Sequence, residues 1–272
     1  NIKSVTHFPV GIEVLDLSST DIEMIPADCI KDLQGLKRLL LFQCRRLRSL
    51  PELPGLLELL MAEDCDSLER VTSPFNTRYA QLNFTNCFKL GEEARRVIIQ
   101  RLSLVALACL PGKVIPSEFN HRARGSSLTI TRPSSAPSTF KVCVVIAPNE
   151  RQHVRNFVYV NLRCRILGSR WCDYPDIVGL EHHFRSTGIR TEHLCIFHAG
   201  MPAIIDEALF EFSISAQNPL DEYEIVECGV QILTGEWERM TDEKLNGLGQ
   251  VSEDEDDEWS EDSEEDSEDS SD

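Results

Sequence analysis

The residues of this chain that could hold a metal or act as nucleophiles are ten cysteines and seven histidines. Zinc sites usually place their ligands in closely spaced pairs such as C-x-x-C. No such cysteine pair occurs, and the nearest approach is Cys195-x-x-His198 together with the adjacent His182 and His183. Those spacings do not match a zinc site, so we predict neither a metal nor another cofactor.

Sequence motifs of well-known catalytic sites are also missing from the chain. It contains no G-x-S-x-G nucleophile turn, no H-E-x-x-H zinc motif and no G-x-x-x-x-G-K-[ST] phosphate-binding loop. The remaining candidates, His182 and His183 beside Glu181, are typical of a solvated loop, and Asp173 and Asp176 are typical of surface carboxylates. We therefore predict that this chain is not an enzyme.

The cysteines favour a structural role instead. Cys44, Cys65 and Cys87 occupy equivalent positions of a repeated pattern, where side chains usually pack or cap the loop that follows a strand. A disulfide framework is typical of short secreted chains, whereas this chain is long and begins without a signal-peptide pattern. We expect a reduced protein in the cytoplasm and/or the nucleus.

The repeated pattern is clearest from Leu36 to Leu50, LKRLLLFQCRRLRSL, which reads L-x-x-L-x-L-x-x-C-x-x-L-x-x-L. This pattern is typical of a leucine-rich repeat, in which L-x-L forms a short strand. One coil cannot bury its own leucines, so further copies are expected to stack on either side. Three copies fit: Ile12, Leu15, Leu17, Ile22 and Ile25; Leu56, Leu59, Met61, Leu68 and Val71; and Tyr79, Leu82, Phe84, Cys87 and Leu90.

These copies predict a leucine-rich-repeat solenoid, an α/β architecture, over residues 1–90. The strand leucines Leu15, Leu39, Leu59 and Leu82 follow one another at intervals of 24, 20 and 23 residues. A solenoid needs a cap on its first coil, and residues 1–11 supply none, so we expect a fragment of a longer protein.

The side chains between the strand leucines should line the inner face of the solenoid. The predicted rows are Asp16, Leu40, Leu60 and Asn83, and Ser18, Phe42, Ala62 and Thr85. Leu40, Phe42 and Leu60 would then form an exposed apolar patch, with Arg38 and Glu58 beside it. Such patches often mark binding surfaces; the alternative is that the following domain covers this one.

Residues 91–106 are predicted as a helix that caps the last coil. Ala94, Ile98, Leu102, Val105 and Cys109 recur at three- and four-residue steps, and Glu92 and Glu93 suit the positive end of a helix. The most apolar run, Val97 to Leu110, contains Gln100 and Arg101 and is too short to span a membrane.

Residues 107–235 are predicted as an all-β domain, because short apolar or alternating runs are separated by turn-rich segments. The expected strands are Ser127–Thr131, Lys141–Ala147, Tyr159–Ile166, His193–His198, Ala208–Ser215 and Gly229–Leu233. The expected core is Val144, Ile146, Val160, Leu162, Leu194, Ile196, Phe210, Phe212 and Val230.

Two long, weakly patterned segments of this domain are predicted to be binding loops. Pro148–Asn156 carries Arg151 and Arg155, and Gly168–Arg190 carries Arg170, Trp171 and Tyr174. Arginine and aromatic residues are enriched in binding hot spots. The alternative is that Trp171 belongs to the core of the domain.

The charge of the chain is concentrated at one end. The net charge of the whole chain is −18. Residues 253–272 contain fourteen acidic residues and no lysine or arginine, so the rest of the chain carries a net charge of −4. We predict a disordered acidic tail over residues 236–272, because it has too few apolar residues to offset the entropy of ordering. No basic stripe favours nucleic-acid binding.

Four motifs, in order along the chain, carry a resemblance to a known family. They are Asn83–Leu90 (NFTNCFKL), Leu110–Phe119 (LPGKVIPSEF) with Gly125–Ile130, Glu192–Phe197 (EHLCIF), and Cys228–Leu233 (CGVQIL). Residues 1–235 thereby resemble the last repeats and the C-terminal jelly-roll/immunoglobulin-like domain of plant TIR-type nucleotide-binding leucine-rich-repeat disease resistance proteins.

The resemblance implies plant innate immunity, in which these two domains recognise a pathogen effector protein and act on upstream nucleotide-binding and TIR domains. The chain contains neither of those domains, so the NAD-hydrolysing activity of the TIR domain cannot be assigned to it. A non-catalytic scaffold or adaptor, or a truncated decoy that pairs with a full-length receptor, is the alternative.

Overall fold

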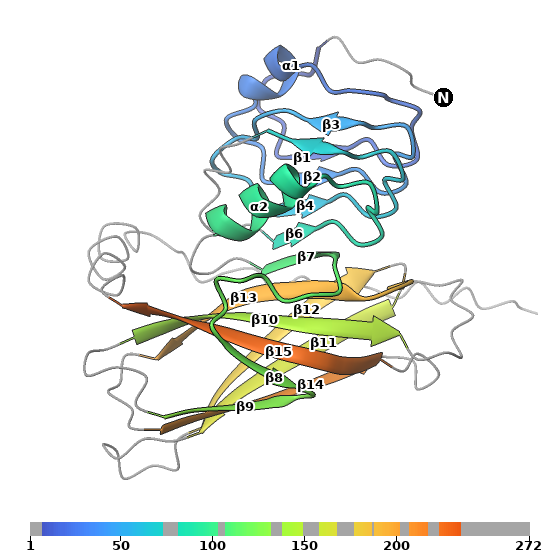
Figure 1. The fold of residues 1–272 in the computed structure, drawn as a ribbon. Coiled ribbons are helices and arrows are strands. Elements are labelled where there is room, and N and C mark those ends of the chain that lie inside the picture. The colour runs from blue at the N-terminus through green and yellow to red at the C-terminus, as the bar shows by residue number, and fades with distance from the viewer. Residues whose placement is uncertain are drawn as a thin grey trace, which may run out of the picture. The chain divides into compact units, whose positions relative to one another are not determined.

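The computed structural model of this chain consists mostly of β-sheet, with few helices (Figure 1). It describes residues 7–72, 81–102, 107–131, 138–148, 158–167, 177–186, 188–201, 207–216 and 223–234. The chain divides into two units, residues 1–237 and 238–272, and every described residue belongs to the first unit. The predicted acidic tail lies outside the described residues.

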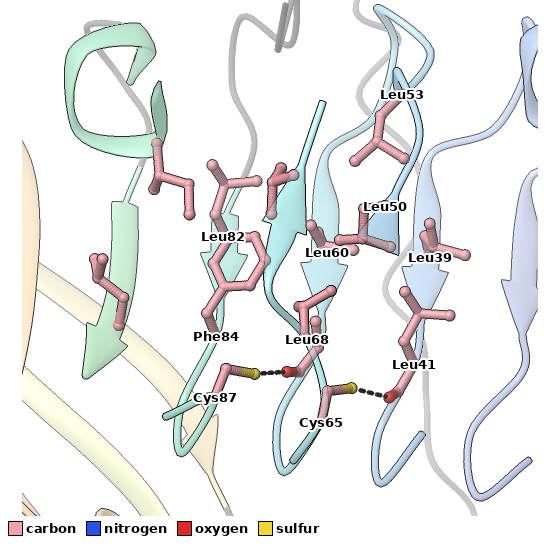
Figure 2. Packing of buried hydrophobic residues seen from close by; sticks show 14 of the residues in the cluster. Leu39, Leu41, Leu50, Leu53, Leu60, Cys65, Leu68, Leu82, Phe84 and Cys87 are labelled. Atoms are coloured by element: carbon pink, nitrogen blue, oxygen red, sulfur yellow. Dashed lines mark hydrogen bonds between the residues drawn. The ribbon is translucent and has the colours of Figure 1, made fainter. Parts of the chain in front are cut away.

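Five short strands stack in parallel at one end of a nine-stranded sheet. They are β1 (Val14–Asp16), β2 (Arg38–Leu40), β4 (Leu59–Met61), β6 (Gln81–Asn83) and β7 (Leu107–Pro111). The register makes neighbours of Leu15, Leu39, Leu60, Leu82 and Ala108, which are all buried. One side chain from each coil therefore enters a continuous core (Figure 2).

The coils also carry three short elements outside the nine-stranded sheet. β3 (Ser49–Leu50) pairs in parallel with β5 (Arg70–Val71) in a separate two-stranded sheet. The helix α1 (Ala27–Lys31) buries Cys29 and Ile30 in the same core.

The predicted register of the third coil is wrong by one residue. Leu57 and Leu60 are buried, whereas Leu59 and Met61 are half-buried and Leu56 is 63% exposed. The equivalent strand leucines are therefore 24, 21 and 22 residues apart, not 24, 20 and 23. The run LLELLM offers apolar residues to both faces, and a shift of one residue exchanges the two faces of a strand.

Each coil turns at the same point through a residue with left-handed backbone. Ser19, Gln43, Asp64 and Asn86 have φ of 58°, 55°, 53° and 62°. This conformation costs a non-glycine residue roughly 1–2 kcal/mol. The first three of these backbone N–H groups donate to the carbonyl oxygens of Phe42, Glu63 and Thr85 in the next coil, at 2.6, 2.9 and 3.0 Å. The hydrogen bonds help to offset the backbone strain.

The cysteines of the repeats fasten each coil to the one before it. The thiols of Cys44, Cys65 and Cys87 donate to the carbonyl oxygens of Leu17, Leu41 and Ala62 at 3.0, 3.1 and 2.7 Å. Figure 2 draws two of these contacts as dashed lines. The predicted equivalence of the three cysteines and their role in holding the loop are confirmed.

The segment after the last coil differs from its prediction. The helix α2 covers only Glu92–Arg101, and Leu107–Pro111 forms the strand β7, so Cys109 lies on a strand and not on a helix. Val105 lies outside the described residues. β7 is parallel to β6 on one side and antiparallel to β13 (His193–Met201) on the other. Among the described residues, neither helix is long and apolar enough to cross a membrane.

The nine-stranded sheet continues past β7 and packs against a second sheet. Its remaining strands are β13, β10 (Ser138–Pro148), β15 (Tyr223–Thr234) and β8 (His121–Arg124), in that order. The second sheet has the order β12 (Ile177–Ser186), β11 (Val158–Leu167), β14 (Glu207–Ala216) and β9 (Ser127–Thr131). Both sheets contribute to one core, in which Phe140 meets Phe210 edge to face at 5.1 Å.

The six predicted strands all exist, and β9 has the predicted bounds. The sequence did not predict β7, β8 or β12, and β12 lies within the predicted loop Gly168–Arg190. Val144, Ile146, Phe210, Phe212 and Val230 lie in the core between the sheets, as predicted. Leu194 and Ile196 instead belong to the other core cluster, and the side chains of Val160 and Leu162 lie outside the described residues.

Candidate functional site

The exposed face of the parallel strands is set by their register. Buried and accessible side chains alternate in β1, β2 and β4, whereas in β6 Asn83 is buried as well as Leu82. The residues on either side of each buried leucine form two rows. The first row is Val14, Arg38, Leu59 and Gln81, and the second is Asp16, Leu40, Met61 and Asn83. Val14 is 51% exposed and Arg38 is exposed, whereas Leu40, Leu59 and Met61 are half-buried.

A third row follows two positions beyond the ends of the strands. The backbone hydrogen bonds of the turns align Ser18, Phe42, Glu63 and Thr85. Phe42 is half-buried, whereas Glu63 and Thr85 are fully buried. Along this row the half-buried side chains of the first two coils thus give way to buried polar side chains in the third and fourth.

The structure places the predicted site residues of the coils as follows. Arg38 and Leu40 lie two residues apart on β2, and Phe42 follows on the same side of the strand. Glu58 is exposed but lies in the row of Lys37 and Glu13, which form an ion pair at 3.1 Å. The prediction that Leu60 is exposed is wrong, because it is fully buried in the core.

Leu59 and Met61 take the place that was predicted for Leu60. The intervals between Cys44, Cys65 and Cys87 are 21 and 22 residues, the same as between the true strand leucines. An alignment on the cysteines would therefore have found these two residues. The predicted loop residues Arg151, Arg155, Arg170, Trp171 and Tyr174 lie outside the described residues.

The last coil is joined to the two-sheet region by a buried polar network around Asn86. Its side-chain amide donates to the Asp64 carboxylate and to the Gly188 carbonyl, both at 2.9 Å. Its amide oxygen accepts the backbone N–H of Arg190 at 3.2 Å, and the Arg190 guanidinium lies 2.9 Å from the same Asp64 carboxylate. Asp64 is 2% exposed, so this ion pair holds a charge that would be costly to bury alone.

His193 completes this network in an unusual way. By the pattern of the other turns, the Asn86 N–H should donate to the carbonyl of residue 111 in the next coil. It donates instead to Nε2 of His193 at 2.9 Å, and the Pro111 carbonyl accepts a hydrogen bond from Arg95. Nδ1 of His193 lies 2.8 Å from the Thr191 carbonyl, so the neutral ring donates from Nδ1 and accepts at Nε2.

The surroundings of His193 favour its neutral form. The side chain is completely buried, and this burial lowers the pKa of His193 from 6.5 to about 4. The hydrogen bond to Thr191 opposes this shift, and the charge of Arg95 adds to it. The ring also contacts Phe88 edge to face, with centroids 6.1 Å apart.

The described cysteines are buried packing groups. Burial raises the pKa of Cys164 to about 12 and of Cys228 to about 11, and it raises the pKa of Cys44 and Cys143. A thiol in this state is a poor nucleophile. Within the described ranges, no group of three or more histidine, cysteine or acidic residues is arranged to hold a metal ion.

Comparisons with known proteins place this geometry in context. The chain is 60% identical to disease resistance protein RML1A of Arabidopsis thaliana over 241 residues, which is 88% of the chain. It is 43% identical to disease resistance protein RML1B over 234 residues, and 31% identical to the probable disease resistance protein RPP1 over 236 residues, both from the same plant. No protein-family model matches.

The chain spans only part of each relative. The matched regions are 24% of RML1A, 22% of RML1B and 19% of RPP1. The matched segments take in 84–88% of the chain.

Proposed function

The chain is a homologue of plant disease resistance proteins of the TIR-type nucleotide-binding leucine-rich-repeat class, and from this premise we propose that it recognises a pathogen effector protein. In this proposal the parallel coils are leucine-rich repeats, and the two packed sheets are the jelly-roll/immunoglobulin-like domain that follows them. Nucleotide-binding and TIR domains of the same receptor family are the second partners. The location, cytoplasmic or nuclear, is part of the proposal.

One observation supports a protein partner above all others. Leu40, Phe42 and Met61 lie side by side on the accessible face of the coils, and the exposed Arg38 borders them. Phenylalanine, methionine and arginine are enriched at protein–protein interfaces, and the centre of an interface is more apolar than its rim. Stacked coils offer an extended surface of this kind without a deep pocket.

The test begins with the purified full chain and a panel of plant-pathogen effector proteins, measured by biolayer interferometry. We expect at least one effector to bind, and Arg38→Glu and Leu40→Glu each to weaken that binding by about 1–3 kcal/mol, which is roughly 5- to 150-fold. Leu56→Glu is the matched control, because Leu56 is 63% exposed and lies outside all three rows.

The melting temperature of each variant is measured alongside, because Leu40 is half-buried and its replacement could act through stability. A loss of binding counts only where the variant still melts well above the assay temperature. If an effector that binds the wild type binds both variants equally well, or if Leu56→Glu weakens it as much, the surface is not on these rows.

A further inference from the structure

A cleft with a volume of about 580 Å³ lies on the face of the nine-stranded sheet that is turned away from the second sheet. Its floor is a polar row across three neighbouring strands: His198 on β13, Lys141 on β10 and Gln231 on β15. Its rim comes from the end of α2 and from residues 117–118. The cleft is distinct from the exposed rows of the coils.

The position of Lys141 is unusual. The next residues on the same face of β10, Cys143 and Val145, are fully buried in an apolar cluster. Lys141 is only 6% exposed, and lysine is almost never buried to this extent unless it is paired. Its ammonium donates to the Ile99 carbonyl in the last turn of α2, where the helix dipole favours a cation.

That contact explains how the fold accommodates a buried lysine. It does not explain why the side chains beside Lys141 are also polar. His198 is also buried, at 9% exposed, and Gln231 extends the row on the other side. A face built for packing alone would continue the apolar pattern of Cys143 and Val145, because burying polar groups costs free energy.

The side chains around the cleft are rich in hydrogen-bond donors. Besides the Lys141 ammonium they include the amides of Gln100 and Gln231 and the hydroxyl of Ser117, and Glu118 is the carboxylate that lines this cleft. The Lys141 ammonium, which can only donate, together with these neutral donors suits an acceptor group such as an oxyanion. Leu102 and Leu233 add an apolar wall, and the volume is within the usual range for small-molecule sites.

We propose that this cleft binds a small organic anion whose carboxylate or phosphate group is held by Lys141, with the row of His198 and Gln231 beside it. Glu118 accepts from a hydroxyl or amino group of the same ligand. Because Glu118 repels the anionic group itself, its neutralisation tightens the binding of a simple anion that lacks such a donor. This site does not depend on effector recognition.

The proposal is tested by isothermal titration calorimetry on the full chain, with inorganic phosphate and succinate as separate probes at constant ionic strength. We expect one or both to bind the wild type, Lys141→Gln to weaken that binding at least tenfold, and Glu118→Gln to tighten it about threefold or more. Lys89→Gln, at an exposed lysine outside the cleft, should leave it unchanged. Binding of phosphate alone or of succinate alone identifies which oxyanion the site prefers.

Three results would overturn the proposal: no binding of either probe, equal weakening by Lys89→Gln, or binding that Lys141→Gln leaves intact. If Lys141→Gln does not fold, because it also removes the contact to Ile99, Glu118→Gln decides. Tighter binding by that variant supports the site, and unchanged or weaker binding refutes it.

Discussion

His193 makes the stability of this protein depend on pH in a direction that the structure fixes. The buried ring accepts the Asn86 N–H at Nε2, so a proton on that nitrogen would oppose a donor and bring an uncompensated charge into the core. The pKa of His193 is therefore about 4 in the folded protein, against about 6.5 when the chain is unfolded. Between these values the unfolded chain binds more protons, so the free energy of unfolding falls as the pH falls.

The difference between the two pKa values corresponds to about 3 kcal/mol when it is fully expressed. The contribution is complete above pH 6.5 and is lost as the pH falls through 4. Between pH 7 and pH 5 the expected loss from this residue is about 2 kcal/mol. Urea unfolding of the wild type and of His193→Gln at both pH values measures this loss. The carboxylates contribute the same pH dependence to both proteins, so their contribution cancels in the difference.

We expect His193→Gln to be less stable than the wild type at pH 7 and to lose about 2 kcal/mol less than the wild type on going to pH 5. His121→Gln, at a half-buried histidine on β8, controls for the loss of an imidazole elsewhere. If the wild type and His193→Gln lose equal stability, the assignment of a neutral ring is wrong. A histidine titration by NMR that places the pKa of His193 near 6.5 would refute it directly, without any variant.

Two further predictions concern packing. Leu60→Ala should destabilise the protein by about 2–5 kcal/mol because Leu60 is fully buried, whereas Leu59→Ala should destabilise it much less. Thermal unfolding measures both. A larger loss of stability for Leu59→Ala would mean that Leu59, as the sequence predicted, is the buried strand leucine. Gly229→Ala should destabilise by about 1–3 kcal/mol, because its added methyl would lie 2.8 Å from Ile115. Gly35→Ala is its control, since the nearest atom there is 4.0 Å away, and equal melting temperatures for the two would argue against close packing at Gly229.

The sequence was most informative where one face of an element is buried and the other is not. The alternation in Ser127–Thr131 predicted the bounds of β9, and in the structure its side chains alternate between exposed and buried. In His193–His198 both faces are buried, in two different core clusters. Alternation then carries no signal, and the sequence assigned Leu194 and Ile196 to the wrong cluster.

β7 could not be predicted from local pattern for a different reason. Leu107–Pro111 is buried at every position, and its apolar residues continue the spacing of the preceding helix. Its conformation is decided by two partners that are remote in sequence, β6 on one side and β13 on the other. The same holds for the network at Asn86, whose partners Gly188 and His193 are about a hundred residues away.

Three of the four motifs that resemble the family meet at that joint or beside it. Asn86 and Phe88 come from the first motif, and His193 from the third, and they contact one another directly. Gly112, from the second, donates to the Glu192 carbonyl at 3.0 Å. The ladder of backbone hydrogen bonds between the coils is interrupted at Asn86, because the Pro111 carbonyl of the next coil accepts from Arg95 and the His193 side chain supplies the acceptor instead. The exposed rows of the first three coils lie outside this joint.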